Sequence, residues 1–552
     1  MKHIKIYCEN IHDSIEIEGG ASLSEIVSRL NLGFTPVCAR VNNKTEGMHY
    51  CVYQPKTVEF LDENSPSGSR AYVRALCMML YRAVSRVLPG AELHIQHSIS
   101  RGYYCTLTCD SGYIETDAHT LELIKAEMKS LVERNLPFEH HEERTEDVID
   151  IFLRQGLDDT ALMLRTSHKP YTVYYTLDGI CDCYYGTLVP STGVLTRFDL
   201  RSYKRGFLLL AGDAASLPTE PQEKMYHAFT DYLDFNNILG VRNAGEMNAM
   251  VQQKRAADLI NVAEALHNKY IARIADEITA RYQRGGARIV LVAGPSSSGK
   301  TTTTKRLAIQ LMTNLLQPQM ISLDNYFVDR ERTPLDADGD YDYESLYALD
   351  LEQFNSDLNR ILAGEEVAMP TYSFERGTRE YRGDTLRLKP GGILLIEGIH
   401  GLNPELTEHI PEEMKYRVYV SALTTLTIDS HNWVPTTDNR LLRRIIRDYK
   451  YRGTSAAETI RRWPSVRRGE ERWIFPFQEN ADTTFNSSLL FELGVIRKYA
   501  SRILEDVRND QEEYSEAYRL RRFLEYFEQI PDEFIPPTSL LREFLGGSSF
   551  HY

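Results

Sequence analysis

The sequence predicts an α/β protein whose main domain is a doubly wound, mostly parallel sheet, preceded by a small β-grasp domain and an α+β domain. A continuous apolar run at residues 289–293 is followed by a glycine-rich loop and then by a helical pattern. A second apolar run occupies residues 392–396, and helical stretches lie between and after the two runs. Alternation of this kind is typical of a parallel sheet with helices on both faces.

The pattern of residues 1–62 predicts the small β-grasp domain. Ser22 precedes a helical pattern of about ten residues with Leu23, Ile26 and Leu30 on one face. The strand-like runs around this helix end at turn residues and occupy positions 2–7, 14–17, 36–41 and 57–60.

Three further segments complete the expected organisation. Residues 63–240 predict the α+β domain, with an opening helix and strand-like runs at 171–175 and 206–211. Residues 241–286 predict a helical linker, because apolar residues recur at helical spacing until Gly285 and Gly286. The parallel-sheet domain is expected at 287–500, and a helical tail at 501–552.

The composition excludes several classes of protein. The chain has 552 residues and a formal net charge of −15, so its own field repels nucleic acid and anionic membranes. No apolar run approaches the roughly 18 residues that span a bilayer. The N-terminus lacks the apolar core of a signal peptide, and the eight cysteines show no disulfide framework. We therefore expect a cytoplasmic protein in which a local basic site holds any phosphate ligand.

The glycine-rich loop matches the phosphate-binding pattern G-x-x-x-x-G-K-[ST]. Its glycines allow successive main-chain amides to point inward at phosphate oxygens, and the helix that follows directs its positive end at the same anion. Lys300 is expected to reach the β and γ phosphates, and Thr301 to offer its hydroxyl to Mg²⁺. The alternative is a glycine turn with an incidental lysine. The predicted ATP-binding residues are Gly294, Pro295, Ser296, Ser297, Ser298, Gly299, Lys300, Thr301 and Thr302.

Two carboxylates follow apolar runs, at the strand ends where ligands bind in α/β folds. Asp324 follows the run at 320–323, and Glu397 follows the run at 392–396. Phosphoryl transfer needs one carboxylate at the acceptor hydroxyl and one near the metal ion. We assign Asp324 to the acceptor and Glu397 to Mg²⁺. The alternative is that both are solvated strand-end carboxylates.

An arginine-rich segment stands out against the acidic chain. Residues 440–472 hold ten Arg and one Lys against four acids, a net charge of +7. Arg440, Arg443, Arg444 and Arg447 share one helix face, where like charges repel unless an anion neutralises them. This favours a lid that brings arginines onto the transferring phosphoryl group. A solvated helix or a nucleic-acid patch is the alternative.

Residues 287 to about 485 resemble the uridine kinase and phosphoribulokinase group. The resemblance is carried by GPSSSGKTT, SLDNYF, YDYESLYALD, PTYSF, LLIEGIHGL, DNRLLRRIIRDYKYRG and the ENAD near Asp482, in the family's order. It implies an ATP-dependent kinase in which Asp324 is the base facing the 5′-hydroxyl of a ribonucleoside.

The same resemblance implies roles for further residues. Asp342 matches the ribose-binding carboxylate, and Glu397 the carboxylate beside Mg²⁺. The aromatic residues that flank the nucleobase are matched by Tyr372 and Phe374, a pocket residue by Ile399, and the lid positions by Arg440, Arg443 and Arg447. The sequence departs from the family at one position, because Gly377 replaces the histidine that reads the base. This puts the identity of the acceptor in doubt.

The N-terminal segments also have a resemblance. Residues 1 to about 62 resemble the TGS domain of threonyl-tRNA synthetases, and residues 65–240 their second additional domain. The four editing positions of that domain hold Arg74, Met78, Tyr184 and Leu188. None of these matches the histidine and cysteine set of the editing site, so the resemblance implies neither deacylase activity nor zinc there.

The leading prediction is ATP-dependent phosphorylation of the 5′-hydroxyl of uridine or cytidine. A kinase acting on a sugar, phosphosugar or other small alcohol is the first alternative. The second is an RNA- or translation-linked protein whose phosphate loop acts as a nucleotide switch. Related kinases are oligomeric, which implies a homo-oligomer.

Overall fold

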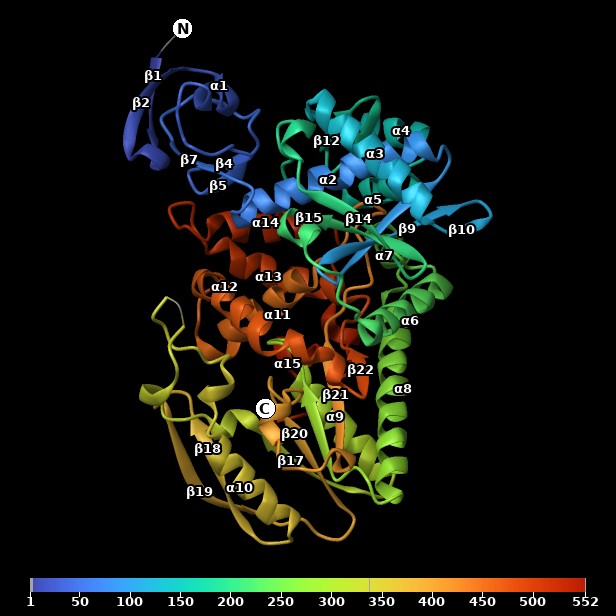
Figure 1. Cartoon of the computed structure of the whole chain (residues 1–552), viewed down its shortest axis with the longest axis vertical. Coiled ribbons are helices and arrows are strands. Elements are labelled where there is room, and N and C mark those ends of the chain that lie inside the picture. The colour runs from blue at the N-terminus through green and yellow to red at the C-terminus, as the bar shows by residue number, and fades with distance from the viewer. Residues whose placement is uncertain (1–2, 337, 552) are drawn as a thin grey trace.

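The computed structural model describes residues 3–336 and 338–551. Lys2, in the first expected strand, and Ala337, in an acidic run, lie outside the described residues. Figure 1 shows a small N-terminal sheet at one end, a second unit beside it, and an α/β unit at the other end. The C-terminal helices, in red, lie between these parts.

The N-terminal unit is a sheet of strand order β2-β1-β7-β4-β5, in which β1 and β7 run parallel. Helix α1 (Leu23–Val27) begins at Ser22 with a capping box to Glu25 and is shorter than the expected ten residues. Its C-terminal turn tightens into i→i+3 hydrogen bonds, such as Leu30 N to Val27 O. The strands of this unit are β1 (His3–Cys8), β2 (Asp13–Glu18), β4 (Cys38–Val41), β5 (Lys44–Glu46) and β7 (Thr57–Leu61), with the pair β3 (Ala21–Ser22) and β6 (Cys51–Val52) beside them.

The second unit is built around helix α2 (Pro66–Val87), which begins at the N-cap residue Ser65 and is buried along most of its length. One antiparallel sheet has the order β10-β9-β15-β14 with β8 on β9, and a smaller one has the order β11-β12-β13. These strands are β8 (Glu92–Ile99), β9 (Gly102–Cys109), β10 (Gly112–Ile114), β11 (Glu139–Arg144), β12 (Tyr171–Leu177), β13 (Ile180–Asp182), β14 (Phe198–Tyr203) and β15 (Gly206–Ala211). The other helices are α3 (Ala118–Arg134), α4 (Thr145–Gln155) and α5 (Asp158–Ser167).

The segment expected as a linker does more than connect. It forms α7 (Ala244–Gln252) and the long α8 (Ala256–Gln283), after α6 (Glu223–Leu239). The apolar stripe of α8, including Ile271 and Ile278, packs in one core with Val290 and Val292 of the parallel sheet. Helix α8 is therefore one layer of the α/β unit. No helix of the described residues is long and apolar enough to cross a membrane.

The α/β unit confirms the predicted parallel sheet. Its strands follow the order β17-β20-β16-β21-β22, and every pair is parallel. Helices α8 and α9 cover one face, and α10 with the β18–β19 hairpin covers the other. The bounds are β16 (Ile289–Ala293), α9 (Lys300–Thr313), β17 (Gln317–Ser322), α10 (Leu351–Leu362), β18 (Val367–Ser373), β19 (Thr378–Leu386), β20 (Gly392–Glu397), β21 (Lys415–Ser421) and β22 (Thr483–Asn486).

The C-terminal helices tie the units together. Their bounds are α11 (Thr436–Arg452), α12 (Ala456–Trp473), α13 (Glu492–Glu505), α14 (Tyr514–Leu524) and α15 (Arg542–Leu545). Glu516 of α14 accepts a hydrogen bond from Arg70 of α2 at 2.9 Å, and Ser515 contacts Thr45 of β5 at 2.5 Å. The segment expected as a tail is thus part of the folded centre.

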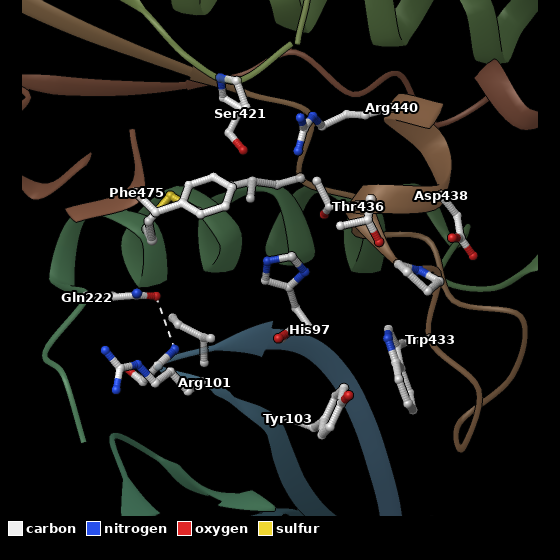
Figure 2. Close-up of a pocket in the computed structure, with 18 of the residues that line it drawn as sticks. His97, Arg101, Tyr103, Gln222, Ser421, Trp433, Thr436, Asp438, Arg440 and Phe475 are labelled. Carbon is white, nitrogen blue, oxygen red and sulfur yellow. Dashed lines mark hydrogen bonds between the residues drawn. The ribbon is translucent and has the colours of Figure 1, made fainter. Parts of the chain in front are cut away.

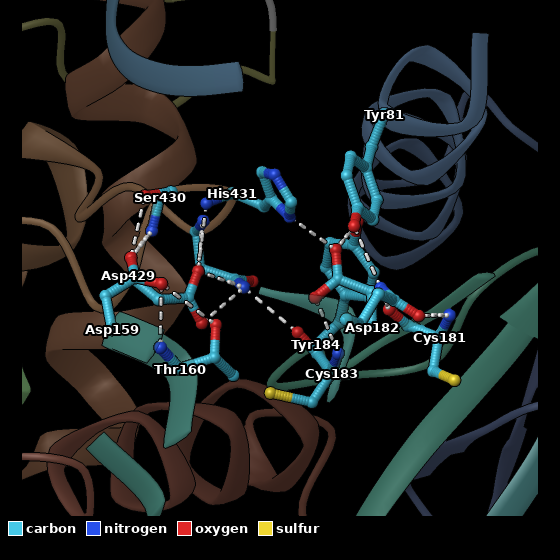
Figure 3. A network of polar contacts seen from close by, with 12 residues as sticks. Tyr81, Asp159, Thr160, Cys181, Asp182, Cys183, Tyr184, Asp429, Ser430 and His431 are labelled. Atoms are coloured by element: carbon cyan, nitrogen blue, oxygen red, sulfur yellow. Dashed lines mark hydrogen bonds and ion pairs between the residues drawn. The ribbon is translucent and has the colours of Figure 1, made fainter. Parts of the chain in front are cut away.

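A buried polar network joins the second unit to the α/β unit (Figure 3). The loop between β21 and α11 carries His431, whose Nδ1 lies 2.8 Å from Oδ2 of Asp182. The hydroxyl of Tyr184 donates to the same oxygen at 2.8 Å. Burial, with the carboxylates of Asp159 and Asp182 nearby, raises the pKa of Asp429 in that loop. The two units are therefore coupled through groups that can titrate.

Candidate active site

The phosphate-binding loop lies between the fully buried strand β16 and helix α9, at the carboxyl edge of the sheet. Ser297 and Gly299 adopt left-handed backbone conformations, with φ of 58° and 84°. A Cβ added at Gly294 would lie 2.1 Å from the carbonyl oxygen of Val420, so no other residue fits there. Lys300 Nζ donates to the carbonyl oxygen of Pro295 at 3.1 Å, across the loop.

The two strand-end carboxylates meet at this loop. Glu397 ends β20 and is paired in register with Ser322, the last residue of β17, and Asp324 lies two residues later in the 3-10 turn Leu323–Tyr326 that follows that strand. The hydroxyl of Thr301 donates to Oε1 of Glu397 at 3.2 Å. The parallel register thus brings together the two candidates that the sequence identified separately.

Burial in the cleft controls the charge of these acids. It raises the pKa of Glu397 to about 7, against the opposing field of Lys300. The side chain of Asp324 is exposed to the cleft, and desolvation by the surrounding protein still raises its pKa, while the cations of Lys300, Arg452 and Arg447 oppose that rise. A carboxylate with a raised pKa is a better proton acceptor than one with an ordinary pKa.

Glu344 is a third acid in the site, and the sequence did not single it out. Burial, reinforced by the carboxylate of Glu470, raises its pKa to about 7. Its Oε2 has no hydrogen-bond partner among the residues that the structure describes. A Cβ at Gly469 would lie 2.3 Å from the Cβ of Glu344, so a glycine in α12 makes room for it. The only sequence signal was its place in the acidic run that contains Asp342.

The expected acceptor side holds an aromatic cluster. The ring of Tyr372 in β18 lies 5.1 Å from Phe374 and 5.5 Å from Phe327, measured between centroids. Tyr372 is buried, and no described residue bonds its hydroxyl, whereas Phe374 is 57% exposed. Asp342 lies in the loop before Glu344, and its Oδ1 accepts a hydrogen bond from the main-chain nitrogen of that residue at 3.1 Å.

Ile399 is placed apart from this aromatic cluster. It packs in a separate apolar cluster with Leu402, Tyr419 and Phe475. Its matched pocket role therefore has no support from a contact with the aromatic rings.

Arg330 takes the space beside Gly377, the position where the family has a histidine. Gly377 lies in the turn between β18 and β19 with φ of 71°, and a Cβ there would lie 2.8 Å from Arg330 Nε. Arg330 donates to the carbonyl oxygen of Phe374 at 2.5 Å. A guanidinium thus stands where the resemblance places an imidazole. The sequence gave no signal for it, because 47 residues separate the two positions.

Arg440 and Arg443 do not lie on an open lid. Both are fully buried, Arg440 in an ion pair with Glu470 and Arg443 in one with Glu492 at 2.6 Å. Arg440 Nε donates to the carbonyl oxygen of Ser296 at 2.9 Å, so it holds the phosphate loop from outside. Protein carboxylates already neutralise these two arginines, and their matched role as phosphate-binding lid residues stays a prediction.

Arg447 and Arg452 lie near the active-site carboxylate of Asp324. Each opposes the rise in the pKa of Asp324, and each pairs with Asp448, at 3.2 and 3.3 Å. Arg444 lies between the two sets of arginines, with its guanidinium 2.9 Å from the hydroxyl of Ser296. Leu441, Leu442, Ile445 and Ile446 of the same helix are all buried.

The C-terminal segment covers the phosphate loop, which nothing in the sequence indicated. Glu543 of α15 accepts hydrogen bonds from the main-chain nitrogen and the hydroxyl of Thr302, at 3.3 and 2.6 Å. The side chain of Leu540 lies against Gly299, where a Cβ would approach it to 2.7 Å. A carboxylate therefore occupies an end of the anion cradle.

The oxygen donors beside the phosphate loop suit a Mg²⁺ ion that is shared with substrate phosphates, rather than a metal ion held by protein side chains alone. No group of three or more His, Cys, Asp or Glu side chains among the described residues could hold an ion. Thr301 and Glu397 offer a hydroxyl and a carboxylate within hydrogen-bond distance of each other. Mg²⁺ is commonly held by one or two carboxylates together with substrate phosphates, and this site supplies the protein share.

Comparisons with known proteins agree with this geometry. Residues 289–489 match the family described as the phosphoribulokinase / uridine kinase family. A uridine kinase of Deinococcus deserti is 30% identical over 195 residues, which cover 35% of this chain and 84% of that protein. This chain belongs to that family. The membership makes the chain a phosphotransferase.

Two further matches have different printed names. A uridine kinase of Halobacterium salinarum is 28% identical over 193 residues, which cover 35% of this chain and 76% of that protein. Among solved structures, a D-glycerate 3-kinase of Cryptococcus neoformans has 15% identity and a TM-score of 0.22 over 49% of this chain and 89% of that one. The likeness of residues 1–240 to synthetase domains remains a prediction.

Proposed function

We propose that this kinase transfers the γ-phosphoryl group of ATP to the 5′-hydroxyl of uridine or cytidine. The observation that carries the proposal is the convergence of Lys300, Asp324 and Glu397 at one edge of the parallel sheet. Phosphoryl transfer requires a cation at the phosphates, a carboxylate at the acceptor hydroxyl and a carboxylate near the metal ion.

Each residue has a defined task in this proposal. The loop amides and Lys300 bind the phosphates, and Asp324 accepts the proton of the attacking hydroxyl as its oxygen bonds to phosphorus. ADP leaves with the electrons of the broken phosphorus–oxygen bond. Bound Mg²⁺ would neutralise charge on the phosphate oxygens, and Thr301 and Glu397 would hold it. Arg447 and Arg452 lie close enough to influence Asp324, and they share the single carboxylate of Asp448 with Arg444, which leaves positive charge for the phosphoryl group.

Arg330 favours a second candidate acceptor, a phosphosugar or another anionic small alcohol. Its guanidinium lies beside the aromatic cluster, in place of a neutral base reader. Arginine recognises phosphate and carboxylate groups through paired N–H donors. An acceptor with an anionic group would therefore be held at this end of the site.

A coupled ADP-release assay decides between the two acceptors. Uridine, cytidine, other nucleosides, sugars and phosphosugars are compared at equal concentration with the full-length chain. Turnover with uridine or cytidine supports the first proposal, and turnover restricted to phosphosugars replaces it with the second. Arg330→Met should raise the KM of the true acceptor about tenfold and leave the KM for ATP unchanged. Arg332→Met, two residues away and exposed, is the matched control.

For the N-terminal half, we propose a binding module rather than a second active site. Met78 and Leu188, at two of the matched editing positions, are buried in an apolar core. Tyr184 is occupied by its hydrogen bond to Asp182. The fourth position, Arg74, lines a cavity instead.

A further inference from the structure

A cavity of about 890 Å³ lies between the second unit and the α/β unit (Figure 2). Its walls come from α2, from the adjoining ends of β8 and β9 with the turn between them, and from the segments 419–440 and 467–478. Pro295 and Arg440 line it, so it adjoins the outer side of the phosphate loop. None of Lys300, Asp324 and Glu397 lines it, and it is therefore separate from the active site.

His97 presents an unpartnered imidazole to this cavity. The residue is only 6% exposed, and Figure 2 shows its ring pointing into the space. One face stacks on Phe229, with 5.0 Å between centroids. No hydrogen bond to either ring nitrogen is found within residues 3–336 and 338–551. Burial lowers the pKa of His97 to about 4, so the neutral ring can donate one hydrogen bond and accept another.

Arg74 supplies a buried positive charge without a carboxylate partner. It is 7% exposed, and its guanidinium lies 4.7 Å from the ring centroid of Tyr185. No ion pair of Arg74 is found in the described parts of the chain. The neighbouring Arg70 and Arg101, by contrast, pair with Glu516 and Glu220. A buried cation left in this state is suited to an anionic ligand.

Aromatic faces complete the lining. The ring of Trp433 lies 4.5 Å from that of Tyr103, at an angle of 46°. Figure 2 shows Phe475 across the cavity from Tyr103 and Trp433, with His97 between them. Flat apolar surfaces that flank a hydrogen-bonding group are suited to a planar heterocycle.

We propose that this cavity binds a nucleoside phosphate, with the base between the aromatic rings and His97 and the phosphate at Arg74. Ligand sites of drug-sized molecules occupy roughly 300–1,000 Å³ and prefer domain interfaces, and this cavity meets both conditions. The volume exceeds what an aromatic amino acid would fill, which favours the larger nucleotide. An occupant would contact Pro295 and so lie directly behind the phosphate loop.

Isothermal titration of the full-length chain tests the site. The probes are UMP and AMP, with uridine lacking the anion, inorganic phosphate lacking the ring, and phenylacetate as an aromatic carboxylate. Arg74→Met and His97→Leu should each weaken UMP or AMP binding about tenfold or more. Arg86→Met is the matched control, because it lies on the same helix, pairs with Glu127 and lines no part of the cavity.

A second measurement covers the case in which Arg74→Met fails to fold. Trp433 is one of three tryptophans, and the nucleoside phosphate should quench its fluorescence in the unmodified chain. The quenching should disappear in Trp433→Phe. Binding unchanged in both Arg74→Met and His97→Leu would place the nucleotide in the active site and overturn the proposal. So would the absence of Trp433 quenching, or tighter binding of phenylacetate than of UMP and AMP. None of these outcomes depends on which acceptor the kinase phosphorylates.

Discussion

The carboxylate of Glu543 bonds the main-chain nitrogen of Thr302 at 3.3 Å, in the first turn of the helix that follows the phosphate loop. The amides of a helix's first turn lack partners within the helix and are a ready anion site. Glu543 therefore occupies a main-chain N–H donor that would otherwise be open to a bound phosphate. Nucleotide binding must displace this carboxylate or share the amide with it.

Removal of the Glu543 charge should strengthen nucleotide binding. In Glu543→Gln the repulsion between carboxylate and phosphates is lost, and we expect the KM for ATP to fall roughly three- to tenfold. Steady-state kinetics with ATP varied would measure this. Glu533→Gln, an exposed acid of the same segment, is the control and should change nothing. An unchanged KM in Glu543→Gln would mean that the segment leaves the cradle without cost.

Asp324→Asn should lose turnover while ATP binding is kept. The amide cannot accept the hydroxyl proton, and loss of a general base typically lowers kcat by about 10²–10⁴-fold. Titration of an ATP analogue should give nearly the parent affinity, whereas Lys300→Ala should lose turnover and bind the analogue more weakly. Asp340→Asn, in an exposed loop, serves as the control. Full activity of Asp324→Asn would show that another group accepts the proton.

Arg443→Met should act mainly on stability. It leaves Glu492 buried and unpaired, and breaking a buried ion pair in this way typically costs about 3–5 kcal/mol. Thermal unfolding would show a lowered melting temperature, and Arg443→Met with Glu492→Leu should recover much of it. A variant that keeps its melting temperature and loses turnover would instead make Arg443 a phosphate ligand.

The junction in Figure 3 should weaken as pH rises. The pKa of Asp429 is raised in the folded protein, so the folded state binds more protons than the unfolded state above pH about 3.9. Stability is therefore lost as pH rises toward the folded pKa. Burial lowers the pKa of His431, but the carboxylate of Asp182 raises it by more. This net rise also makes stability fall as pH rises.

Asp429→Asn removes the titrating group from that junction. Between pH 6 and pH 9 its melting temperature should fall less than that of the parent, by at least about 2 °C. Asp110→Asn, an exposed aspartate of the second unit, should follow the parent. A larger fall in Asp429→Asn than in the parent would contradict the assignment.

Much of the candidate site could be predicted from the sequence because its signals are local. The loop from Gly294 to Thr301 needs only consecutive residues, and the carboxylates Asp324 and Glu397 directly follow apolar runs. Parallel strands then align their carboxyl ends, so their meeting follows from the fold class. The arginine pattern was also local, but its interpretation needed the partners. Glu470 and Glu492 face Arg440 and Arg443 only after α11, α12 and α13 pack.

The sequence by itself determined the parallel sheet, the phosphate-loop motif and the phosphotransferase class, because periodicity and motif spacing are properties of contiguous residues. Only the tertiary structure decided which arginines are buried, that Arg330 fills the space beside Gly377, and that Glu543 reaches Thr302 from 241 residues away. It also created the cavity between units that Arg74 and His97 both line. Such contacts depend on how separate elements pack, and no local pattern encodes that.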